Sequence, residues 1–139
     1  MENLRETIEN AWNNRALLTE ENTILAIRKV IDLLDAGTLR VAEPTSDGWQ
    51  VNEWVKKAVI LYFPIRKMET IEVGPFEFHD KMALKTNYAE LGVRVVPHAV
   101  ARYGAFNARD VVLMPSYGNI GALVGGGTMV GPWATLGCC

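Results

Sequence analysis

The sequence predicts an α+β fold, in which an N-terminal helical α/β domain is followed by the first coils of a parallel β-helix. Two observations carry this prediction. The first 64 residues contain three segments with apolar residues at helical spacing. From Val100 onward the sequence instead repeats every six residues, a period that fits neither a helix nor a strand. We expect the α/β domain in residues 1–93 and the start of the β-helix in residues 94–139.

The six-residue period suits a chain that turns a corner every six residues around a triangular prism. We expect the apolar member of each hexad to fill the prism, and a small residue four positions later to relieve crowding. The expected interior residues are Val100, Phe106, Val112, Gly118, Val124, Val130 and Leu136. A globular β domain with chance spacing is the alternative, but one phase holds through all seven hexads. The pattern covers only two full coils, so we expect an open end with unpaired backbone.

The N-terminal segments are predicted as helices over residues 2–17 and 20–35, and over a third stretch that Asn52 caps and Pro64 ends. Thr19 is the expected N-cap of the second helix, and Gly37 its C-terminal stop. Between the second and third helices, residues 39–43 and 49–51 are expected to pair as a hairpin around a turn at 44–48.

Aromatic and charged residues of this part are expected to be structural. Trp49 and Trp54 are interpreted as anchors of a small core rather than as ligand-stacking residues. His79 and Asp80 could form a base with its orienting carboxylate, but a solvated loop is the favoured interpretation. No glycine-rich phosphate loop, nucleophile elbow or zinc-type spacing occurs in the sequence.

Composition narrows the class of protein further. The chain has 139 residues, 49% of them hydrophobic, and a formal net charge of −2, which gives no support to nucleic-acid or anionic-membrane binding. The polar, acidic N-terminus is unlike a signal peptide, and no apolar run has the length of a membrane span, so a cytoplasmic location is expected. Cys138 and Cys139 are adjacent, and we interpret them as ordinary thiols rather than as a disulfide or a metal site.

Several stretches together resemble the bacterial 2,3,4,5-tetrahydropyridine-2,6-dicarboxylate N-succinyltransferases, in their N-terminal half only. The most specific is Leu113-Met114-Pro115-Ser116-Tyr117, followed by Asn119-Ile120-Gly121-Ala122. The other stretches are residues 31–43, 54–61, 94–97, 104–106 and 127–130. The similarity runs over nearly the whole length of the chain.

The resemblance implies an acyltransferase of the hexapeptide-repeat class, with a left-handed β-helix. Its members transfer a succinyl group from the co-substrate succinyl-CoA to the amine of an acyclic amino-dicarboxylate, on the lysine and diaminopimelate pathway. They bind no permanent cofactor. They work as homotrimers, with active sites between neighbouring β-helices. Arg94 occupies a substrate-binding position of the family, where a guanidinium could grip a substrate carboxylate.

Two departures from the family pattern affect the expected function. The family has Val-Asp-Thr-Trp where this chain has Val130-Gly131-Pro132-Trp133, so the Asp that contacts the substrate amine region is replaced by Gly131. No catalytic residue is therefore assigned. The coils that line the CoA site in the family lie beyond the last residue, so residues that bind the co-substrate are not assigned either.

These departures favour an incomplete and inactive acyltransferase chain. The alternative from another class is a non-catalytic binding or assembly module that associates through its open β-helix edge. A β-helical carbonic anhydrase is rejected, because such a zinc site needs three histidines and the chain has only His79 and His98.

Overall fold

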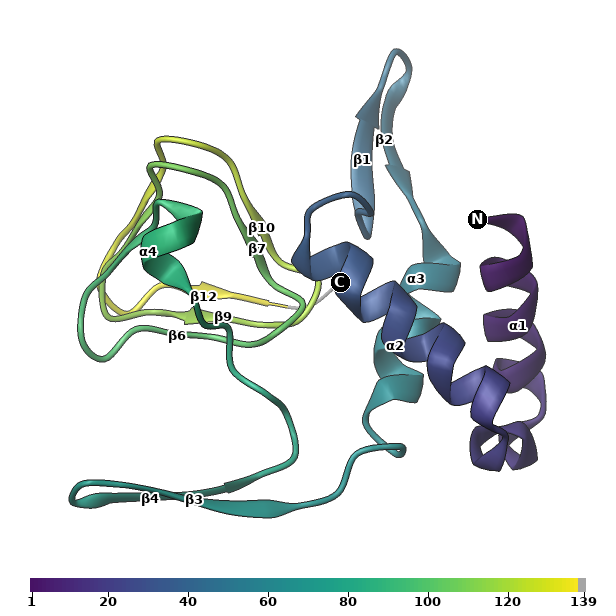
Figure 1. Cartoon of the computed structure of the whole chain (residues 1–139). Coiled ribbons are helices and arrows are strands. Elements are labelled where there is room, and N and C mark those ends of the chain that lie inside the picture. The colour runs from purple at the N-terminus through teal and green to yellow at the C-terminus, as the bar shows by residue number, and fades with distance from the viewer. Residues whose placement is uncertain (138–139) are drawn as a thin grey trace.

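The computed structural model describes residues 1–137, and Cys138 and Cys139, with the thiol prediction made for them, lie outside this range. Figure 1 shows helices at the N-terminal side and a triangular coil at the other. The helices are α1 (Glu2–Asn13), the 3-10 helix η1 (Arg15–Thr19), α2 (Glu21–Asp35), α3 (Glu53–Tyr62) and α4 (Tyr88–Leu91). None of the helices in residues 1–137 is long and apolar enough to cross a membrane.

Helices α1, α2 and α3 pack together because each presents one apolar face to the others. The fully buried side chains at their junction include Ile8, Ile27 and Leu61. The predicted first helix is shorter than expected, since η1 follows it after Asn14, whose side chain accepts a hydrogen bond from the Ala16 N–H. The three predicted helical segments are otherwise confirmed.

Of the two N-cap predictions, the one for α2 is wrong. Glu20, not Thr19, is the N-cap of α2, and the Thr19 hydroxyl instead donates to the Ala16 carbonyl within η1. Asn52 is the N-cap of α3, as predicted, although its side chain makes no capping hydrogen bond. Its amide donates to the Arg40 carbonyl and to Glu43 Oε1, because the hairpin strand before it runs close by.

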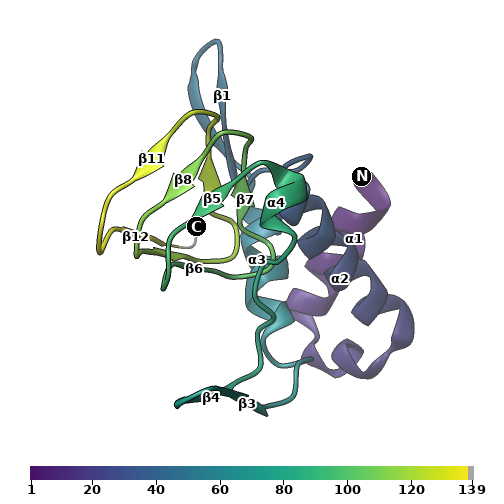
Figure 2. The same ribbon diagram turned by 60° about the vertical axis from the view of Figure 1, so that its left-hand side comes forward.

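Two antiparallel hairpins project from the body of the molecule (Figures 1 and 2). One pairs β1 (Ala42–Thr45) with β2 (Gly48–Val51), three residues later than the predicted first strand. The other pairs β3 (Glu69–Val73) with β4 (Phe76–Asp80). The prediction that Trp49 anchors the core is wrong, because it lies on a projecting strand and is 74% exposed, whereas Trp54 is buried.

The remaining strands form a parallel β-helix, whose three faces are visible in Figure 2. One face carries β5, β8 and β11, a second β6, β9 and β12, and the third β7 and β10. All of these pairs are parallel. The strands are β5 (Arg94–Val95), β6 (Val100–Ala101), β7 (Phe106–Asn107), β8 (Val112–Leu113), β9 (Tyr117–Gly118), β10 (Leu123–Val124), β11 (Met129–Val130) and β12 (Thr135–Leu136).

The predicted phase of the hexads is wrong by one residue in β6, β7 and β8, and it is right from β9 onward. The register pairs Val112 with Arg94 and Met129 on the outer side, and Leu113 with Val130 on the inner side. In β6, β7 and β8 the buried residue therefore lies one position after the predicted one, as Leu113 (3% exposed) does after Val112. The cause is length: the first coil advances 18 residues from Arg94 to Val112, and the second only 17 to Met129.

The helical part and the coil share one hydrophobic core. The fully buried Ile120, which lies in the coil, belongs to the same apolar cluster as α1, α2 and α3. Tyr103 packs against this cluster, and its hydroxyl donates a 2.8 Å hydrogen bond to Asp32 Oδ1 on α2. A second cluster, including Val111 and Leu113, fills the prism itself. Because α2 lies directly against the coil, the faces of the prism have fixed positions relative to the helices.

Candidate functional site

Arg94 begins β5, the first strand of the coil. Its backbone N–H donates to the Val111 carbonyl, which ties β5 to the neighbouring strand β8. Val95, the next residue, turns toward the prism, so strand alternation places the Arg94 side chain on the outer surface. Among residues 1–137 the guanidinium makes no salt bridge and no side-chain hydrogen bond. Its donors are therefore available to an anion.

Gly131 lies just after β11, on the same face of the coil as Arg94. Arg94 and Met129 both pair with Val112, so two strand spacings, roughly 10 Å, separate β5 from β11. A Cβ placed on Gly131 would meet nothing within 4 Å. The position is therefore open to a side chain, and the glycine is not required by packing.

A corner of the coil adjoins Gly131 and holds a hollow of about 270 Å³. Its lining includes His98, Pro115 and Trp133, one from each successive coil. The rings of His98 and Trp133 lie 5.6 Å apart, and Trp133 adopts a left-handed backbone conformation with φ of 62°. The left-handed backbone of a residue other than glycine costs about 1–2 kcal/mol. The Trp133 N–H donates to the Pro115 carbonyl at 2.6 Å, and this hydrogen bond holds the conformation.

The His98–Trp133 corner was not predicted, although a signal for it exists. Pro97, Pro115 and Pro132 recur with the period of a coil, and each directly precedes a residue that lines the hollow. Since proline fixes φ and favours a bend, this spacing marks a repeated corner.

His79 and Asp80 do not form a base with its carboxylate. They lie on adjacent positions of β4 and so point to opposite faces of the hairpin. His79 Nδ1 shares a 3.0 Å hydrogen bond with Thr70 Oγ1, while Asp80 forms a salt bridge with Arg102. The favoured interpretation, a solvated loop, is also wrong in its secondary structure, since both residues belong to a strand. No group of His, Cys, Asp or Glu able to hold a metal ion occurs within residues 1–137.

Two tyrosines, Tyr103 and Tyr88, have shifted pKa values. Burial, together with the Asp32 carboxylate that accepts its hydrogen bond, raises the pKa of Tyr103 to about 12. Burial also raises the pKa of Tyr88. Since both hydroxyls stay protonated at neutral pH, neither supplies a base. The chemistry that Arg94 itself offers on this face is recognition of an anion.

Comparison with known proteins identifies the family of this chain. Residues 3–65 match the family described as tetrahydrodipicolinate N-succinyltransferase N-terminal. The chain is 46% identical over 147 residues to the 2,3,4,5-tetrahydropyridine-2,6-dicarboxylate N-succinyltransferase of Xylella fastidiosa strain Temecula1, covering 98% of this chain and 53% of that protein. The protein of the same name from Polynucleobacter asymbioticus is 49% identical, and the match covers 95% of this chain and 52% of that protein. The one from Acinetobacter baylyi is 46% identical, and the match covers 100% of this chain and 55% of that protein.

A helical domain followed by parallel β-helix coils, with these relatives, places the chain in a family whose named members are N-succinyltransferases. It belongs to the tetrahydrodipicolinate N-succinyltransferase family and corresponds to the N-terminal half of those proteins. The chain spans about half the length of the curated relatives it matches.

Proposed function

We propose that this chain supplies the dicarboxylate-binding face of a succinyl transfer reaction. In that reaction the succinyl group moves from the co-substrate succinyl-CoA to the amine of the acyclic form of tetrahydropyridine-2,6-dicarboxylate. The names of the relatives support succinyl transfer and the dicarboxylate substrate, and the family resemblance supplies succinyl-CoA as the donor. The observation that carries the proposal for this chain is Arg94, whose guanidinium has no partner within residues 1–137 and lies on the outer face of β5, β8 and β11.

Arg94 would hold one substrate carboxylate through two parallel N–H···O hydrogen bonds. Such a planar, charge-assisted pair fixes both the position and the orientation of the carboxylate. A roughly 10 Å separation of β5 from β11 leaves room for an extended dicarboxylate to lie along the face, with its amine end toward Gly131. Arg94 is thus a binding residue, and its contribution falls on substrate affinity and alignment.

The transfer also needs a group that holds the amine and takes up its proton. The amine attacks the thioester carbonyl, the C–S bond breaks, and CoA leaves as its thiol while the amine loses a proton. Gly131 has no side chain to accept that proton. We therefore assign this chain the binding of the dicarboxylate, and no proton acceptor is assigned among its residues.

A homotrimer with sites between neighbouring β-helices is part of the same proposal. The outer face next to Arg94 supports it, since Met129 is 68% exposed and Trp133 at the adjoining corner is 77% exposed. Side chains of this kind on one face favour contact with another protein surface.

A second candidate function is a binding or assembly module that associates through the edge of the coil. One observation favours it: β10, β11 and β12 each pair on one side only within residues 1–137. Their other edge is free to pair with a strand of another chain. Sedimentation of the chain alone and with a full-length relative separates this from dicarboxylate binding.

Calorimetric titration with pyridine-2,6-dicarboxylate, a stable planar analogue of the substrate, tests the main proposal. Replacing Arg94 with Gln should weaken binding about tenfold or more, because a charge-assisted pair is lost. Arg94→Lys should also weaken binding, since Lys keeps the charge but not the planar fork. The matched control is Arg28→Gln, which removes the same charge from an exposed position on α2. Equal affinity in all four proteins would refute the role of Arg94.

A further inference from the structure

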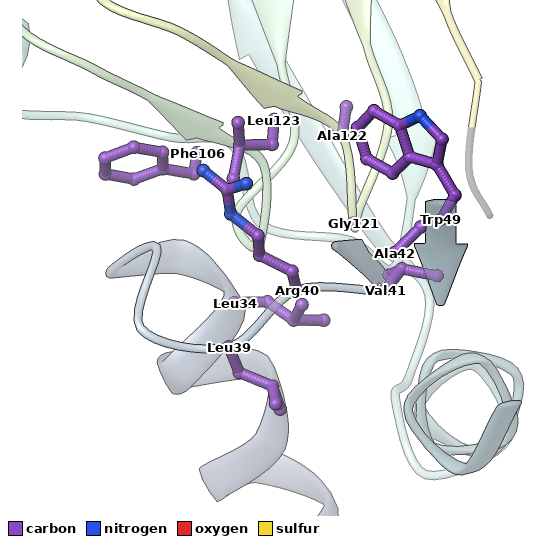
Figure 3. Close-up of a pocket in the computed structure, with 10 residues that line it drawn as sticks. All are labelled: Leu34, Leu39, Arg40, Val41, Ala42, Trp49, Phe106, Gly121, Ala122 and Leu123. Atoms are coloured by element: carbon purple, nitrogen blue, oxygen red, sulfur yellow. The ribbon is translucent and has the colours of Figure 1, made fainter. Parts of the chain in front are cut away.

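A second cavity lies between the end of α2, the β1–β2 hairpin and the β7–β10 face of the coil (Figure 3). Its volume is about 250 Å³, just below the ~300 Å³ lower end of small-molecule pockets, so its occupant has to be small. Neither Arg94 nor Gly131 lines it. The cavity therefore belongs to a different face of the coil from the proposed dicarboxylate site.

The floor of this cavity is preformed. Leu34, Leu39 and Val41 line it and are at most 8% exposed, because they belong to the helical core. The Phe106 ring packs directly on Gly37, where a Cβ would lie 2.6 Å from Phe106 Cδ2. Packing on both sides thus fixes the apolar wall, and a ligand would not have to order it on binding.

Arg40 brings a positive charge to this apolar wall. Figure 3 shows its side chain extending from the segment between α2 and β1 toward Leu123. Within residues 1–137 the guanidinium makes no salt bridge and no side-chain hydrogen bond. The neighbouring carboxylate of Glu43 accepts from the Asn52 amide instead. A half-buried charge without a counter-ion favours an anion, since buried charges in proteins are normally paired.

Trp49 supplies an aromatic side to the same cavity. Its indole lines the cavity from strand β2 and is 74% exposed, whereas Trp54 is buried. A large apolar surface that faces a cavity becomes favourable when a ligand covers it. The Trp49 indole is therefore suited to the apolar body of a ligand, and Arg40 to its charge.

We propose that this cavity binds a small monocarboxylate with a ring-sized apolar body. Its carboxylate pairs with the Arg40 guanidinium, and its body lies against Trp49. The site is independent of the proposed succinyl transfer, because it shares no residue with the Arg94 face.

The test uses benzoate as the probe and the whole chain as the protein. Benzoate is titrated while the indole N–H signals of the protein are followed by nuclear magnetic resonance, with Trp49→Phe used to assign the Trp49 signal. The Trp49 signal should shift saturably, and the signal of the buried Trp54 should stay in place. Benzamide, which keeps the ring and lacks the charge, should bind about tenfold or more weakly.

Variants locate the site independently of function. Arg40→Gln should weaken benzoate binding about tenfold or more, and Arg28→Gln, the matched exposed control, should leave it unchanged. Ala122→Leu should fill the cavity and abolish the Trp49 shift, and the spectrum of each variant reports whether it is folded. The proposal is overturned if folded Arg40→Gln binds benzoate as well as the parent, or if benzoate leaves the Trp49 signal in place.

Discussion

The ammonium of Lys85 lies 2.5 Å from Asp35 Oδ1, and the same oxygen accepts a 2.8 Å hydrogen bond from the Gly104 N–H. Asp35 ends α2, Lys85 lies in the segment before α4, and Gly104 belongs to the first coil. The Lys85 side chain is only 2% exposed and that of Asp35 21%. One buried ion pair therefore joins the helical part to the coil.

Breaking this pair from one side should be costly. Asp35→Asn leaves the buried Lys85 ammonium without its counter-charge, and we expect a loss of about 3 kcal/mol in the free energy of unfolding. The double variant Asp35→Asn with Lys85→Met should be more stable than Asp35→Asn alone, because the uncompensated charge is removed. Urea denaturation of the two variants and the parent measures this. Equal stability of the single and double variants would show that solvent reaches Lys85.

Gly37 should tolerate no side chain, for two separable reasons. Its φ of 71° is left-handed, and an added Cβ would lie 2.6 Å from the Phe106 ring. Gly74, in the β3–β4 turn, has a φ of 56° and nothing within 4 Å of an added Cβ, which makes it the matched control. We expect Gly74→Ala to cost about 1–2 kcal/mol and Gly37→Ala about 1–3 kcal/mol more, measured by urea denaturation. Equal losses would mean that Phe106 moves aside freely.

Ionisation of Tyr103 should reduce the stability of the folded protein at alkaline pH. Burial and the Asp32 carboxylate raise the pKa of Tyr103 from 10.0 to about 12, so the protonated hydroxyl is favoured in the folded state. Its contribution to stability is complete below pH 10 and is lost as the pH rises toward 12. Stability of Tyr103→Phe should therefore fall less steeply over this range than that of the parent. Denaturation of both proteins at pH 9 and pH 11.5 measures the difference. An equal loss of stability in the parent and in Tyr103→Phe would contradict the prediction.

Much of the fold follows from periodicity. The apolar spacing of Ile27, Ile31 and Leu34 is visible in the sequence, and all three are buried in α2. The hexad period likewise predicts the coil. The phase is not predictable in the same way, because the second coil is one residue shorter and the step from Leu113 to Gly118 breaks the period inside the prism. Coil length depends on corner geometry, which composition does not reveal.

Other residues could not be placed from the sequence, because their surroundings depend on segments that are distant along the chain. Whether Trp49 is buried depends on which way a hairpin projects, and local sequence does not determine that direction. Lys85 and Asp35 are charged residues 50 positions apart, so their pairing and the burial of Lys85 emerge only in the folded chain. Arg94 was singled out through family resemblance alone, because an isolated arginine has no pattern of its own. The Arg40 cavity combines three distant segments and has no sequence signature.

Restoring a carboxylate after β11 should change which ligands the Arg94 face prefers. Gly131→Asp is sterically free, since an added Cβ meets nothing within 4 Å. Its carboxylate would lie on the same face as Arg94, two strand spacings away. We expect it to attract the ammonium of 2-aminopimelate, an acyclic amino-dicarboxylate, and to repel a carboxylate of pimelate, which has no amine.

The measurement is the ratio of the two dissociation constants, obtained by calorimetry for the parent and for Gly131→Asp. The parent should distinguish the two ligands weakly, and the variant should favour 2-aminopimelate by about fivefold or more, as a charged pair near the surface contributes about 1 kcal/mol. Gly137→Asp is the matched control, because it adds the same charge where a Cβ also meets nothing within 4 Å, one strand further along the coil after β12. An unchanged ratio in Gly131→Asp would mean that the dicarboxylate does not extend from Arg94 toward position 131.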